Sequence, residues 1–121
     1  MTGMFEVSLV LDFHRLPELF CGFVRRPGQG LTRYPVACNP QAWAAGSAFM
    51  ALQACLGLSI IASEQKVVFN YPILPEFIDK MQIKNLKVGT ASVDLLLRRH
   101  DLDVGITVIR RAGKVEVVSV K

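Results

Sequence analysis

The spacing of apolar residues in the first half of the chain is helical. Apolar residues recur every four positions from Phe5 to Phe13, which predicts a short helix there. A longer helix is predicted from Pro40 to Leu56, because Asn39 is a good N-cap residue, proline suits the first helical position and Gly57 favours an end. This second helix is apolar nearly all round, which is typical of a helix inside a larger assembly.

After residue 63 the pattern changes to an alternation of apolar and polar residues, which predicts β-strands. The predicted strands cover residues 67–70, 83–88, 91–98, 104–109 and 115–120. In the third of these, Ala91, Val93, Leu95 and Leu97 are predicted to share one face. The short connections between them favour antiparallel hairpins, and one or two turns of helix are expected at Glu76–Met81. The expected fold class is α+β, with a helical segment over residues 1–63 and a mostly antiparallel β-domain over residues 64–121.

Composition indicates more apolar surface than a small domain needs. Of the 121 residues 51% are hydrophobic and 20% are charged, and the mean hydropathy is +0.36. We interpret this excess as surface that seeks a partner, and expect a homo-oligomer formed through the N-terminal helices. The alternative is a small and very apolar core.

Charge and cysteine content narrow the function classes. The net charge is +4, but no aromatic residues interleave with the arginine pairs at 98–99 and 110–111, and no nucleic-acid-binding motif accompanies them. We therefore expect no nucleic-acid partner. The three cysteines match no metal-site spacing, and are expected to be reduced thiols of a cytoplasmic protein that needs no metal or cofactor. Neither a signal peptide nor an apolar run of the roughly 18 residues that span a membrane is apparent.

Between the two predicted helices lies a loop, residues 15–39, that contains one unusually placed carboxylate. Glu18 follows Pro17 in an apolar segment closed by glycine, which is a poor place for a surface charge and a good place for a carboxylate fixed in a cleft. Inverting glycosidases use such a base opposite a general acid about 6.5–9.5 Å away. Gln41 suits hydrogen bonding to sugar hydroxyls, and Trp43 offers an apolar platform for a sugar ring. The alternative is that Glu18 is an exposed loop residue and Trp43 a core residue.

Four segments carry a resemblance to a known family: RLPELFCGF, YPVACNPQAWAAG, FMALQACLGL and YPILPEFIDKMQIKNLKVGTASVDLLL. Together they resemble the C-terminal part of bacterial amylo-α-1,6-glucosidases of the glycogen-debranching type and, more distantly, the last part of glucoamylases. The resemblance implies that the N-terminal helices are the last helices of an (α/α)6 toroid and that a small β-domain follows. It also implies Glu18 as the candidate general base, with Gln41, Trp43 and Arg15 binding substrate.

The function implied by the resemblance is inverting hydrolysis of α-1,6-glucosidic bonds in an α-glucan or oligosaccharide. The family's general acid lies far upstream of these motifs, and nothing in this sequence corresponds to it. We therefore expect the chain to be inactive by itself. The alternative from another class is a non-enzymatic interaction or carbohydrate-binding module that self-associates.

Overall fold

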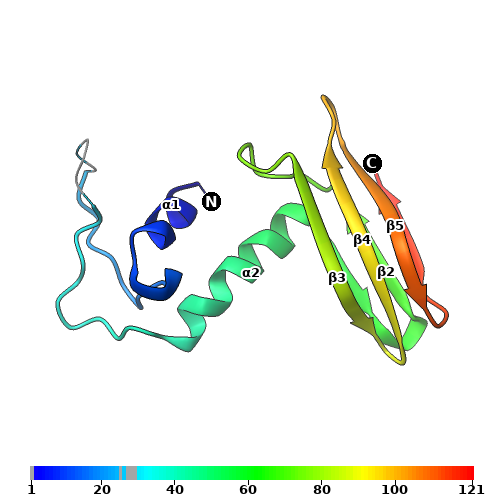
Figure 1. Cartoon of the computed structure of the whole chain (residues 1–121), viewed down its shortest axis with the longest axis horizontal. Coiled ribbons are helices and arrows are strands. Elements are labelled where there is room, and N and C mark those ends of the chain that lie inside the picture. Colours follow the sequence, from blue (N-terminus) through cyan, green and yellow to red (C-terminus); the bar gives the residue numbers. More distant parts are fainter. Residues whose placement is uncertain (1, 25, 27–29) are drawn as a thin grey trace. The chain divides into compact units, whose positions relative to one another are not determined.

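A computed structural model describes residues 2–24, 26 and 30–121 of the chain. The fold is α+β, as the sequence predicts: the described residues form two α-helices and two three-stranded sheets (Figure 1). The chain divides into two compact units, one that ends at Ala51 and one that covers Leu52–Lys121. We call the second one the β-unit and the first one the helical unit.

The helical unit contains little regular structure. Helix α1 (Thr2–Leu9) is followed by the 3-10 helix η1 (Asp12–His14), and helix α2 (Ala42–Leu56) begins in this unit and ends in the β-unit. The helix predicted for 5–13 therefore stops four residues early, and Phe13 has a left-handed backbone with a φ of 55°. The buried core of this unit is small and consists of Val7, Leu11, Leu16 and Ala44.

Helix α2 differs from its prediction at its start and agrees with it at its end. Its first turn is closed by the N–H of Ala45, which donates to the carbonyl of Gln41 at 3.1 Å, so Gln41 and not Asn39 occupies the N-cap position. Gly57 follows the last helical residue with a φ of +53°, and a Cβ at that position would lie only 2.0 Å from the carbonyl oxygen of Asn70. Only glycine fits this turn without strain.

Six strands form the β-unit. They are β1 (Leu58–Ile61), β2 (Lys66–Asn70), β3 (Lys80–Val88), β4 (Ala91–Arg99), β5 (Val104–Ala112) and β6 (Glu116–Val120). One sheet has the order β1-β2-β6 and the other the order β3-β4-β5, with β4 antiparallel to both of its neighbours. Strand β1 was not predicted, and it pairs with β2. This pairing is one reason why the boundary between the two units lies between residues 51 and 52 and not near residue 63, where the composition changes.

One hydrophobic core joins the two sheets. Val67 and Phe69 of β2 and Val93, Leu95 and Leu97 of β4 are all fully buried in the same cluster. The face predicted from the alternation over residues 91–97 is therefore confirmed as the core face of β4. Packing between sheets is what buries these side chains, since each sheet has only one face toward the core.

The connection from β5 to β6 is not the hairpin that its length predicts. Strand β6 crosses to the other sheet and pairs in parallel with β2, with Val68 opposite Val118. Val115, just before β6, is only 4% exposed because it enters the core between the sheets. The short turn therefore forms a corner between two layers, and burial of Val115 outweighs the local preference for antiparallel pairing.

The helical turns predicted for Glu76–Met81 are also absent. This segment is an irregular turn, in which the N–H of Ile78 donates to the carbonyl of Pro75 at 2.8 Å, and strand β3 begins at Lys80. The guanidinium of Arg99 donates to the carbonyls of Pro75 and Ile78. A side chain from β4 thus satisfies carbonyl groups that a helix would have used internally.

Candidate functional site

The loop that contains Glu18 folds back on itself. The N–H of Glu18 donates to the carbonyl of Cys38 at 2.9 Å, and the N–H of Cys21 donates to the carbonyl of Thr32 at 3.2 Å. Between these contacts Phe20 forms an isolated antiparallel bridge with Arg33. We call this two-stranded segment, residues 18–38, the arm; residues 25 and 27–29 lie outside the described part of it.

Glu18 is fixed at the base of the arm. Its Oε2 atom accepts a hydrogen bond from the backbone N–H of Cys38 at 3.2 Å, in addition to the bond between the two backbones. The side chain is partly buried, and Pro17 beside it is buried. The carboxylate is therefore oriented by the opposite strand of the arm, while its other oxygen, Oε1, accepts no hydrogen bond from a described residue.

The three residues predicted to bind substrate flank the arm in the sequence: Arg15 precedes it, and Gln41 and Trp43 follow it. The guanidinium of Arg15 lies over the ring of Phe13, 5.3 Å from its centroid. Gln41 precedes α2 and is partly buried, and Trp43 is 56% exposed on the first turn of the helix. Trp43 is therefore not a core residue of the helical unit; Ala44 takes that role.

Glu18 contacts Cys38, which lies three residues before Gln41 in the sequence. Among the described residues, no hydrogen bond or ion pair links Glu18 to Arg15, Gln41 or Trp43. The arrangement fixes one carboxylate against the backbone of Cys38, and does not by itself enclose a sugar.

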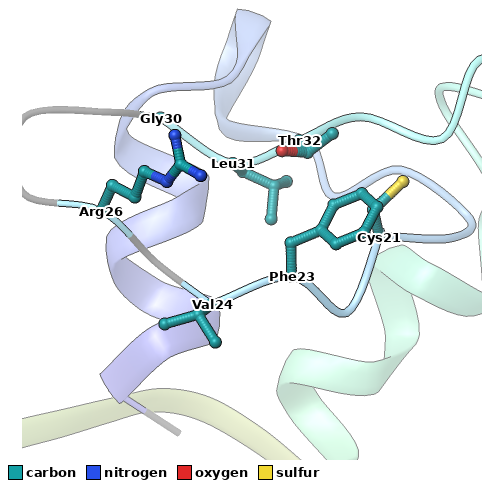
Figure 2. A pocket seen from close by; sticks show the side chains of 7 residues that line it. All are labelled: Cys21, Phe23, Val24, Arg26, Gly30, Leu31 and Thr32. Atoms are coloured by element: carbon teal, nitrogen blue, oxygen red, sulfur yellow. The ribbon is translucent and has the colours of Figure 1, made fainter.

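A pocket that the sequence did not predict lies farther along the arm (Figure 2). Its volume is ≈ 360 Å³, and it is lined by Cys21, Phe23, Val24, Arg26, Gly30, Leu31 and Thr32. Figure 2 shows the ring of Phe23 and the guanidinium of Arg26 among its lining groups. None of the four predicted site residues lines it, and the signal that the sequence offered for it is an aromatic residue, Phe23, three positions before Arg26.

Two carboxylates of the β-unit, Asp94 and Asp103, have lowered pKa values. The pKa of Asp94 is lowered, first because Arg110 donates to its carboxylate (Nε to Oδ2 2.8 Å, Nη2 to Oδ1 3.0 Å) and second because the N–H of Asn85 donates to Oδ1 at 2.7 Å. The pKa of Asp103 is lowered mainly by a hydrogen bond from Lys121. These carboxylates organise turns and bulges of the sheet, so they are structural.

Neither a metal centre nor a membrane helix is found in the part of the chain that the structure describes. No group of three or more His, Cys, Asp or Glu side chains there is arranged to hold a metal ion, and Cys21, Cys38 and Cys55 are free. None of the helices over the described residues has the length and apolarity that crossing a bilayer requires.

Comparisons with known proteins add no family. No protein-family model matches the chain, and neither a curated protein nor a solved structure matches it.

Proposed function

We propose that this chain supplies the general base, Glu18, of an inverting α-1,6-glucosidase of the glycogen-debranching type. The observation that carries the proposal is the hydrogen bond from the Cys38 N–H to Oε2 of Glu18, which orients one carboxylate within the motif that resembles this family. A base that activates water must hold a fixed direction toward the water, and a carboxylate anchored through one oxygen keeps the other for that water.

The remaining parts of such a site have to come from other residues. Inverting hydrolysis needs a general acid about 6.5–9.5 Å from the base, and the proposal assigns it to an upstream (α/α)6 toroid of which α1 and α2 are the last helices. Support comes from the apolar residues that the helical unit leaves exposed, such as Phe49 and Met50 on α2, at 76% and 71%. A toroid of helices would cover such residues, and so would self-association through the same helices.

In this proposal Gln41, Trp43 and Arg15 bind the glucan. The indole of Trp43 is exposed enough to stack on a sugar ring, and the amide of Gln41 and the guanidinium of Arg15 are suited to sugar hydroxyls. The three free cysteines support a cytoplasmic location, which is where glycogen-type glucans are stored and degraded.

The test joins this chain to the helical catalytic part of a debranching-type α-1,6-glucosidase, in exchange for that enzyme's own C-terminal part. We expect the chimera to hydrolyse panose and limit dextrin, with inversion at the anomeric carbon followed by NMR. Glu18→Gln should lower kcat by about 10²–10⁴-fold, because the amide cannot accept a proton from water. It should leave the KM nearly unchanged, because the amide oxygen can still accept the Cys38 N–H.

The matched control is Glu76→Gln, which makes the same chemical change on an exposed turn of the β-unit and should leave kcat unchanged. Equal activity of Glu18→Gln and the parent chimera would contradict the proposal, as would a folded chimera that hydrolyses nothing. The isolated chain should show no hydrolysis of either substrate. Binding of limit dextrin by the isolated chain, together with an inactive chimera, would favour the carbohydrate-binding alternative.

A further inference from the structure

Four strands are the open edges of the two sheets in the described part of the chain, and three of them are protected against pairing. Strand β3 carries lysines and a bulge between Ile83 and Leu86, β5 carries two arginines and a bulge opposite Asp94, and β1 has only four residues. Charges, bulges and shortness are the usual ways in which proteins prevent an edge strand from adding another strand. Strand β6 has five residues and no bulge, its one charged residue, Glu116, stands at its start, and its middle residues are Val117, Val118 and Ser119.

The hydrogen-bonding groups on the free side of β6 can be identified from its contacts. The N–H of Glu116 donates to Gln65 at 2.9 Å, and the carbonyl of Val120 accepts from Tyr71 at 2.9 Å, so these even-numbered residues direct their backbone groups toward β2. Backbone groups alternate sides along a strand. Val117 and Ser119 therefore point their N–H and C=O groups out of the sheet, at the open edge.

We propose that the open edge of β6 binds β6 of a second copy of this chain, antiparallel and around a two-fold axis at Val118. In this register Val117 lies opposite Ser119 of the second copy, and these residues exchange backbone hydrogen bonds on both sides of the axis. Val118 then faces itself. Because Val68 is already opposite Val118 within one copy, the outer face gains a continuous row of four valines across the two β-units.

Charge at the two corners of this edge favours the antiparallel arrangement. Strands β5 and β6 are joined by residues 113–115 alone, so their edges lie next to each other. One corner carries the exposed Arg111 and Lys114, together with Glu116, whose carboxylate lies 3.8 Å from Nζ of Lys66. The opposite corner, at the start of β5, carries Asp101 and Asp103. Asp103 is paired with Lys121, which leaves the exposed Asp101 as the acidic group there.

An antiparallel copy reverses the edge and therefore places each basic corner beside an acidic corner. A copy added in parallel would bring like charges together. The edge is thus complementary to itself, which is why a second copy and not an unrelated strand is the occupant we assign. The inference concerns the β-unit alone and does not depend on Glu18 or on any activity.

The first test uses a cysteine on the proposed axis. In the full chain, Val118→Cys places the new thiol opposite itself in a non-hydrogen-bonded pair, where the geometry allows a disulfide. We expect oxidation to give a covalent dimer in which the introduced thiols of the two copies are linked to each other, mapped by peptide mass spectrometry. The matched control, Val120→Cys, lies on the same face of β6 but opposite Glu116 of the second copy, and should stay at the background set by the native cysteines of the parent chain.

The second test measures the orientation in the Val118→Cys background. Arg111→Asp and Asp101→Arg should each lower the yield of the covalent dimer, and the two changes together should restore it. Circular dichroism of each variant shows that the β-unit is folded. Equal cross-linking at positions 118 and 120, absence of the link at position 118 in a folded chain, or a double variant that does not recover would each overturn the proposal.

Discussion

Eleven buried hydrophobic residues form the core of the β-unit, whereas four form the core of the helical unit. The large hydrophobic residues that stay exposed show the opposite distribution, with thirteen up to Ala51 and seven after it among the described residues. The β-unit therefore has the burial of an independent domain. The helical unit has the apolar residues of a domain core without the surrounding elements that would bury them.

The candidate chemistry lies in the less buried unit. Glu18 and the arm belong to the unit with the small core, and Asp94 and Asp103, whose pKa values are lowered, belong to the other. Surfaces that bind ligands or partners are commonly placed on the less stable parts of a protein, and rigid scaffolds hold them. Breaking each unit separately tests this division.

Val104→Asp should have the largest effect on stability. Val104 is 3% exposed in the core between the sheets, and an unpaired charge there costs about 3–5 kcal/mol. We expect loss of the cooperative unfolding transition of the β-unit in urea, followed by circular dichroism. The matched change Val24→Asp, at a residue that is 90% exposed on the arm, should leave the transition in place. Equal effects of the two variants would show that the units do not differ in burial.

Gly57→Ala should destabilise the β-unit by at least about 2 kcal/mol, because the new Cβ would combine a positive φ with a collision against Asn70. Thermal unfolding monitored by circular dichroism measures the change. An unchanged melting temperature would mean that the junction between α2 and β1 can relax at little cost.

Gly46→Ala is the counterpart in the helical unit, at a glycine inside α2. A Cβ at Gly46 meets no atom within 4 Å, so the change should stabilise α2 by roughly 0.5–1 kcal/mol. Slower amide hydrogen exchange in α2 is the measurement. Faster exchange after this change would show that the glycine is needed for close packing that the described residues do not provide.

Protonation of Asp94 should give the smallest and most local effect. Its pKa is lowered in the folded protein, so its contribution to stability is present above the unfolded value of about 3.9 and is lost as the pH falls through the lower folded value. As the pH is lowered below about 4, we expect the urea concentration at the midpoint of unfolding to decrease. The decrease should be smaller in Asp94→Asn. Asp103→Asn, which removes the pair with Lys121, serves as the comparison at the other end of the sheet. Identical pH profiles of Asp94→Asn and the parent chain would contradict this role.

Much of the β-unit could be predicted because its signals are local. Alternation over residues 91–97 identified the core face of β4, and Gly57 marked the end of α2, since both depend on the period and the backbone preference of neighbouring residues. The candidate site was predictable to the same extent. The proline before Glu18 and the glycine after it indicate a constrained carboxylate, but its hydrogen-bond partner, Cys38, lies twenty residues away.

The α+β class, the strands of the β-unit except β1, and one constrained carboxylate in a long loop all follow from patterns in the sequence. Three features come from the folded structure instead: β6 pairs in parallel with β2, Arg99 donates to carbonyl groups of an irregular turn where a helix was expected at 76–81, and the arm closes through Cys38. These features depend on contacts between distant residues. Burial of Val115 and satisfaction of isolated carbonyl groups outweigh the local preferences that short turns and periodicity express.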